Sequence, residues 1–128
     1  MQLQAVTIYA IRIIQHLHTS TDKMQAGTEI ANTLGLTYPV FMRVAMRLRQ
    51  ESFLVSAKGR TGGYMLGKAA EDISFYDVFY CMQGEPSFHK DLGNGNAKNE
   101  TEKLNHFLQG VQNDMVSNMS KISILDLI

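Results

Sequence analysis

The chain has 128 residues, of which 45% are apolar and 19% are charged, and these values are typical of one globular domain with a single core. No unbroken apolar stretch approaches the roughly 18 residues of a membrane span, and no basic patch followed by an apolar run marks a signal peptide. One cysteine, Cys81, excludes an internal disulfide and favours a reducing, cytoplasmic location.

The net charge of zero hides an asymmetry along the chain. Residues 1–69 contain eight Lys or Arg and three acidic residues, a net charge of +5. Residues 70–128 contain four Lys and nine acidic residues, a net charge of −5. The first part therefore favours an anionic partner, although solvated charges without a partner are the simpler alternative.

The first two predicted helices flank a polar loop. Apolar residues recur at helical spacing over residues 3–17, at Leu3, Val6, Ala10, Ile13, Ile14 and Leu17. The following stretch "HTSTDKMQAG" breaks this period and predicts a loop. We expect a short second helix with Thr28 as its N-cap and Gly35 as its stop, and with an apolar face of Ile30, Ala31 and Leu34.

A third helix is predicted directly after a tight turn at Gly35 and Leu36. Thr37 can cap it, and Pro39 is tolerated in its first turn. Its buried face is predicted to be Phe41, Val44, Ala45 and Leu48. The opposite face carries Tyr38, Pro39, Met42, Arg43, Met46 and Arg47. A short helix, a turn and a basic helix in this order are typical of a helix-turn-helix.

Two β-prone runs, "FLVSA" at 53–57 and "YML" at 64–66, enclose a basic glycine-rich loop. A nucleotide-binding P-loop needs Gly-Lys-Ser/Thr followed by a helix, whereas Gly67-Lys68 here precedes Ala69. Two short strands after a helix-turn-helix instead predict a wing. Residues 1–69 would then form a winged helix-turn-helix head.

Residues 70–128 are predicted to hold a linker helix, a loop and a long helix. Helical periodicity covers residues 73–82, and a polar loop follows around 85–99. A long helix from about 100 to 122 carries a near-heptad apolar stripe of Leu104, Leu108, Val111, Met115, Met119 and Ile122. The stripe favours dimerisation, and packing back on the chain's own head is the alternative. The apolar tail "SILDLI" is expected to pack against the fold.

Several polar side chains are candidates for contacts with DNA. Lys58 and Arg60 could reach phosphates or enter a minor groove, and Gly62 and Gly63 permit close approach of the loop. Phosphates could also be bound by the hydroxyls of Thr7, Thr28 and Thr37. Bases would be read by the exposed face of the third helix, at Tyr38, Pro39, Met42, Arg43 and Arg47. Within that face we expect Arg43 to contact a base and Arg47 a phosphate.

Three segments resemble the Rrf-type family of winged-helix transcription regulators, which includes repressors of iron–sulfur biogenesis, nitric-oxide response and cysteine metabolism. These segments are "TEIANTLGL", "VFMRVAMRLRQESFLVSAKGRTGGYMLGK" and "ISFYDVFYCMQG". The resemblance extends in layout over nearly the whole chain. It implies a homodimer that crosses its long C-terminal helices and binds a pseudo-palindromic operator on double-stranded DNA.

Some members of this family hold an iron–sulfur cluster through three cysteines before the long helix. The resemblance places those positions near Asp91, Ala97 and Lys103, and His106 where a further histidine ligand would lie. None of the three is a cysteine, and a cluster needs thiolate ligands. We therefore expect no cofactor and no metal, and a lone histidine is more often a surface residue than a ligand.

Cys81 lies among apolar and aromatic residues, which favours an inert packed thiol over a redox switch. No catalytic constellation is evident, so the sequence does not predict an enzyme. The predicted function is a homodimeric DNA-binding repressor with a small-molecule or protein effector and no membrane association. Two alternatives stay open: a redox or metal sensor using Cys81 or His106, and a helical interaction module without specific DNA binding.

Overall fold

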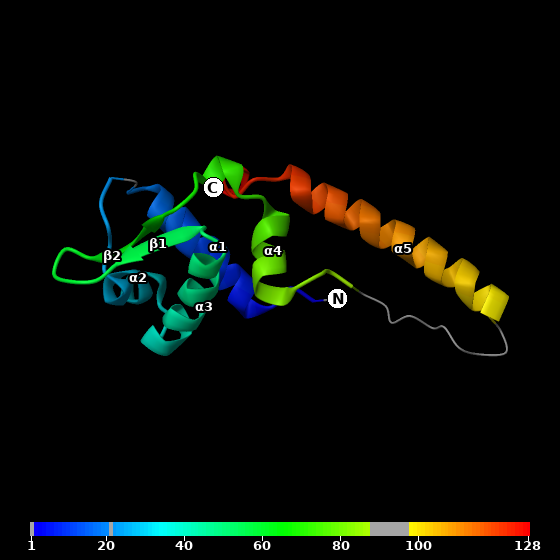
Figure 1. Ribbon diagram of the computed structural model, residues 1–128, viewed down its shortest axis with the longest axis horizontal. Coiled ribbons are helices and arrows are strands. Elements are labelled where there is room, and N and C mark those ends of the chain that lie inside the picture. The colour runs from blue at the N-terminus through cyan, green and yellow to red at the C-terminus, as the bar shows by residue number, and fades with distance from the viewer. Residues whose placement is uncertain (1, 21, 88–97) are drawn as a thin grey trace.

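The computed structural model describes residues 2–20, 22–87 and 98–128 and is mainly helical, with one small antiparallel sheet (Figure 1). No helix among the described residues is long and apolar enough to cross a bilayer. The elements in chain order are α1 (Ala5–His18), α2 (Gly27–Leu34), α3 (Tyr38–Gln50), β1 (Leu54–Ala57), β2 (Gly63–Leu66), η1 (Ala70–Asp72), α4 (Phe75–Gln83), α5 (Lys98–Lys121) and η2 (Leu125–Leu127).

Helices α2 and α3 form the predicted helix-turn-helix. Gly35 ends α2 in the left-handed conformation, with φ of 69°, which favours glycine. Thr37 caps α3, because its hydroxyl oxygen accepts a hydrogen bond from the Val40 amide at 3.4 Å. The predicted apolar face of α3 is confirmed, since its four residues are fully buried: Phe41, Val44, Ala45 and Leu48.

Three sequence predictions near the N-terminus and at the start of α2 are wrong. Helix α1 begins at Ala5, so Leu3 lies outside it and is 44% exposed. Helix α2 begins at Gly27 with Ala26 as its N-cap, so Thr28 lies inside the first turn and caps nothing. Thr7 is fully buried and donates a hydrogen bond to Gln83 Oε1 at 2.6 Å, which removes it from any contact with DNA.

The β1–β2 hairpin is the predicted wing, paired from Leu54↔Leu66 to Ala57↔Gly63. Its stem is attached to the strand-like segment before α2 by two backbone hydrogen bonds between Gln25 and Tyr64, at 2.8 and 2.9 Å. The Tyr64 ring also meets the Phe41 ring edge-on, with centroids 5.3 Å apart. These contacts fix the orientation of the wing relative to α3.

Helix α4 packs beside α1 and α3 and receives the C-terminal tail. Ser74 and Asp77 form a capping box at its start, with both hydrogen bonds at 2.9 Å. The Ile124 amide donates to the Ile73 carbonyl at 2.8 Å, and the Ile124 side chain is fully buried. The expectation that "SILDLI" packs on the fold is therefore confirmed.

Helix α5 is a long helix as predicted, and it begins at Lys98 and ends at Lys121 instead of spanning 100–122. Only its C-terminal end lies near α4, and the rest extends away from the other helices (Figure 1). The chain's own fold covers the apolar stripe only in part, because Leu104, Val111 and Ile122 are 40–44% exposed while Leu108, Met115 and Met119 are partly buried. Most of the predicted loop at 85–99 lies outside the described residues.

Candidate nucleic-acid interface

A groove of about 550 Å³ lies between the start of α2, one side of α3 and the wing. Among its lining residues are two cations, Arg49 and Lys58, and no carboxylate. The lining comprises Ala26, Gly27, Thr28, Tyr38, Met42, Arg49, Ser56, Ala57, Lys58, Gly59, Gly62, Gly63 and Tyr64. The groove is therefore positively charged, which favours the binding of an anionic chain such as a nucleic-acid backbone.

The exposed face of α3 carries the residues predicted to read bases. Tyr38 is 47% exposed and Met42 39% exposed, and Pro39 and Arg43 are exposed beside them. The Tyr64 hydroxyl donates to Met42 Sδ at 3.5 Å, so the wing helps to position this side chain. Four of the predicted base readers thus share one solvent-facing surface that borders the groove.

The arginines in the second half of α3 point in different directions. Arg47 donates a hydrogen bond to the Met82 carbonyl at the end of α4, at 2.9 Å. Arg49 instead reaches the wing and donates to Ser56 Oγ at 3.2 Å. Sequence reasoning did not select Arg49, although its position two residues beyond Arg47, on the opposite side of the helix, was a usable signal.

The tip of the wing presents Lys58 and Arg60, which are both exposed. Gly63 has φ of 139°, and a side chain there would collide with the Gln25 carbonyl. A side chain on Gly62 would collide with the Ala57 carbonyl in the hairpin itself. The two glycines therefore allow the chain to turn tightly at the wing. Glycine is needed at Gly62 because a side chain would not fit, and at Gly63 both for this reason and because of the positive φ.

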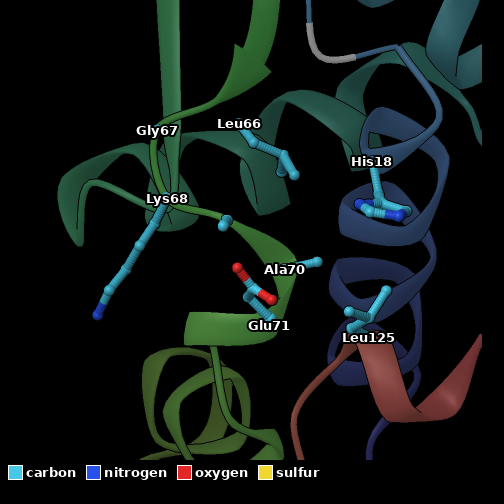
Figure 2. Close-up of a pocket in the computed structure, with 8 residues that line it drawn as sticks. His18, Leu66, Gly67, Lys68, Ala70, Glu71 and Leu125 are labelled. Carbon is cyan, nitrogen blue, oxygen red and sulfur yellow. The ribbon is translucent and has the colours of Figure 1, made fainter.

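A second cavity, of about 390 Å³, lies where α1, the end of β2, η1 and η2 meet. Figure 2 shows that Leu66, Ala70 and Leu125 extend from different elements around a common space with the His18 ring, while the Lys68 side chain extends away from it. Glu71 lies at its edge. Among the described residues, the His18 and Glu71 side chains make no hydrogen bond or ion pair, so their polar atoms are available to a ligand in this cavity.

Cys81 lies on α4 beside the last turns of α3, half-buried, and its thiol donates to the Arg47 carbonyl at 3.4 Å. Its pKa is raised from 9.0 to about 11, first by burial and then by the nearby Glu51 carboxylate, while Arg47 acts to lower it. The thiol is therefore neutral near pH 7, whereas redox and metal-binding cysteines act as thiolates. This opposes the redox alternative.

The residues present do not fit an iron–sulfur cluster held by three cysteines of one chain, because Cys81 is the single cysteine and lies on α4. Lys103 and His106 are exposed on α5, and the positions Asp91 and Ala97 lie outside the described residues. No group of three His, Cys, Asp or Glu that could hold a metal ion occurs within residues 2–20, 22–87 and 98–128.

Comparison with known protein families identifies the architecture. The sequence model of the Rrf2 family, described as iron-dependent transcriptional regulators, matches residues 3–128. This chain belongs to the Rrf2 family. It is accordingly a transcriptional regulator and not an enzyme, and the predicted winged-helix fold is confirmed.

Three known proteins are similar to this chain in sequence or in fold. The Lactococcus lactis protein YffB, a candidate HTH-type transcriptional regulator, is 25% identical over 125 residues, which are 92% of this chain and 79% of that protein. The HTH-type transcriptional regulator NsrR of Halalkalibacterium halodurans is 31% identical over 75 residues, 58% of this chain and 51% of its own. The structure of CymR, the global cysteine regulator of B. subtilis, matches with a TM-score of 0.76 at 17% identity and covers 99% of this chain and 95% of its own.

Proposed function

We propose that this Rrf2-family chain is a sequence-specific DNA-binding repressor that acts as a homodimer on a pseudo-palindromic operator and carries no iron–sulfur cluster. Residues 1–69 form the DNA-binding head in this proposal, and residues 70–128 form the dimerising part. The observation that carries it is the cationic groove between α3 and the wing, bordered by the exposed face of α3. A helix for the major groove and a basic loop for the adjacent minor groove is a known arrangement for reading duplex DNA.

The exposed apolar face of α5 supports the homodimer. Phe107 is 65% exposed, and Leu104 and Val111 lie on the same side of the helix at 44% and 40%. Isolated long helices with such a face are rarely stable in water, because helical stability comes mainly from packing the apolar face. A second copy of α5 covers this face with a matching heptad stripe, and the resulting two-fold symmetry predicts two operator half-sites.

Selection of DNA by the purified protein tests the proposal. Genomic fragments retained by the full chain at physiological salt should share a motif of two inverted half-sites, including fragments upstream of the chain's own gene. Arg43→Ala should relax the base preference at one position of each half-site, at a cost of about 1–3 kcal/mol. Arg60→Ala should weaken binding to all sequences alike if it contacts phosphate.

A repressor should also lower transcription from a promoter that contains the selected motif, because a dimer bound there obstructs the polymerase. Retention of random fragments with no shared motif would contradict sequence-specific binding. Unchanged binding by both variants would show that the contacts lie elsewhere. Cluster absorption in protein purified without oxygen would contradict the cluster-free part of the proposal.

The cavity at the junction of α1, β2, η1 and η2 supports a small-molecule effector (Figure 2). Its volume of about 390 Å³ lies within the usual range for ligand pockets, and its apolar side chains and His18 suit a compact molecule with one or two hydrogen-bonding groups. Because β2 is the second strand of the wing and η2 follows α5, a ligand there would bias the angle between the DNA-binding head and the dimer helix.

A cavity-filling variant tests the effector site. Ala69 lines the cavity and is exposed, so Ala69→Trp should occupy the space without disturbing the core. Free amino acids and small amines that raise the melting temperature of the wild-type protein should leave that of Ala69→Trp unchanged. Equal shifts in both proteins would place the ligand elsewhere.

A further inference from the structure

The C-terminal end of α3, where the chain continues into the wing, places two arginines on different surfaces. The last turns of α3 hold two arginines, Arg47 and Arg49, which are two positions apart and therefore differ by about 200° around the helix axis. Only Arg49 lines the groove between α3 and the wing, and Arg47 is bonded to the Met82 carbonyl on the side of α4. The two cations thus serve different surfaces.

The geometry of duplex DNA says what must occupy this groove. When a helix lies in the major groove and a wing lies in the adjacent minor groove, one sugar–phosphate strand separates them. That strand has to pass between α3 and the β1–β2 hairpin. The groove there has a volume of about 550 Å³ and is lined by Arg49 and Lys58 without a carboxylate.

Arg49 is held in this groove before any DNA is present. Its Nη1 donates to Ser56 Oγ on β1 at 3.2 Å, and no other side-chain hydrogen bond is made by Arg49 among the described residues. A guanidinium has five N–H donors in a fixed plane, so one bond to Ser56 leaves donors for a phosphate. Fixing the side chain beforehand also lowers the entropy lost on binding.

We propose that the groove between α3 and the wing seats one sugar–phosphate strand, and that Arg49, oriented by Ser56, donates to a phosphate of that strand. Ser56 is a positioning residue, because it acts through Arg49. Arg47 holds α4 against α3 instead of binding DNA. This inference rests on the DNA-binding function proposed above. It names a phosphate contact made between the two parts that bind DNA, α3 and the wing.

The experiment uses the full chain and a duplex that the wild-type protein has selected. Arg49→Gln should lower affinity about tenfold for both the selected and an unrelated duplex, since a phosphate contact carries no sequence information. The slope of log K against log salt should become shallower by about one. Lys121→Gln makes the same charge change at the end of α5 and should leave affinity and slope unchanged.

Ser56→Ala gives a readout that a loss of charge cannot give. It should weaken binding by a smaller factor while leaving the salt slope unchanged, because the guanidinium remains but is less ordered. Arg49→Lys should restore the slope and only part of the affinity, since an ammonium lacks the planar fork. The unfolding temperature of each variant shows whether the fold is intact.

Neutral methylphosphonates placed one at a time along the duplex identify the phosphate. One position should weaken the wild-type protein and have little effect on Arg49→Gln, which is the signature of a direct pair. If wild-type protein binds with a steep salt dependence but Arg49→Gln keeps the full slope, the inference is wrong and the DNA-binding function stands. A lower slope in Arg47→Gln instead of Arg49→Gln also overturns it. A wild-type protein that binds no duplex overturns the function itself.

Discussion

At the scale of single residues, the wing depends on backbone conformations that favour glycine. Gly63 combines φ of 139° with the Gln25 carbonyl in the space where a side chain would begin. Gly59, in contrast, has φ of 104° and open space within 4 Å of the position that a Cβ atom would take. Strain and collision therefore act together at Gly63, and strain acts alone at Gly59.

Gly63→Ala should lower the free energy of unfolding by about 2–4 kcal/mol, whereas Gly59→Ala should lower it by about 1–2 kcal/mol. The larger effect arises because the Gln25–Tyr64 bridge must open to admit the methyl group. Chemical denaturation of both variants measures the difference. Equal losses would show that collision with the Gln25 carbonyl is relieved without cost.

The raised pKa of Cys81 makes a prediction about reactivity. Because the pKa is about 11 instead of 9.0, the thiolate fraction near pH 7.5 is about 100-fold smaller than for an unshifted thiol. Alkylation by iodoacetamide should be correspondingly slow in the folded chain and should rise about tenfold per pH unit up to pH 10. The same chain in denaturant is the control, and a rate in the folded chain that levels off above about pH 9, as for a thiol with a pKa of 9.0, would contradict the shift.

At the scale of elements, the start of α4 organises the contact between the head and the C-terminal tail. Ser74 supplies the side chain of the capping box, and its backbone pairs with Ser123 of the tail. The tail and the cap therefore meet at one residue. Loss of the hydroxyl removes the cap but leaves the backbone pairing.

Ser74→Ala should lower the free energy of unfolding by about 1 kcal/mol, the usual contribution of a serine N-cap. Ser117→Ala is the matched control, because Ser117 is exposed within α5 and its replacement should change stability by at most a few tenths of a kcal/mol. Thermal unfolding monitored by circular dichroism compares the two. A loss no larger in Ser74→Ala than in Ser117→Ala would show that the Ser74 hydroxyl contributes no cap.

At the scale of the whole molecule, α5 is a long helix whose apolar face is not fully covered within one chain. The helix projects away from the head (Figure 1), and several of its apolar side chains are exposed. The proposed dimer would cover them and would set the distance between two DNA-binding heads. Dimer stability and operator affinity are therefore expected to change together.

Val111→Glu places a charge within this apolar face and should shift the protein from dimer to monomer, with operator affinity falling by at least tenfold. Ser117→Glu adds the same charge on the opposite side of α5 and should leave the dimer intact. Sedimentation equilibrium measures the first effect and gel-shift titration the second. A dimeric Val111→Glu protein would place the subunit interface elsewhere.

The sequence by itself determined the elements of the head. The fully buried face of α3, the Gly35 stop, the Thr37 cap and the hairpin around the glycine-rich loop all follow from local rules of periodicity, capping and turns. The errors at Leu3 and Thr28 concern helix ends, where neighbouring backbone groups can replace a side-chain cap. The family was indicated by the resemblance of three sequence segments in and just after the head, and the Rrf2 family model over residues 3–128 confirmed it.

Only the tertiary structure decided where individual side chains point. Thr7 is hidden because Gln83, far along the chain, accepts its hydroxyl proton. Helical spacing places Arg47 and Arg49 on opposite sides of α3, but only the packing of α4 on one side and of the wing on the other decides their partners. Local periodicity determines which face of a helix is polar, but contacts between distant segments determine which polar side chain remains free to bind.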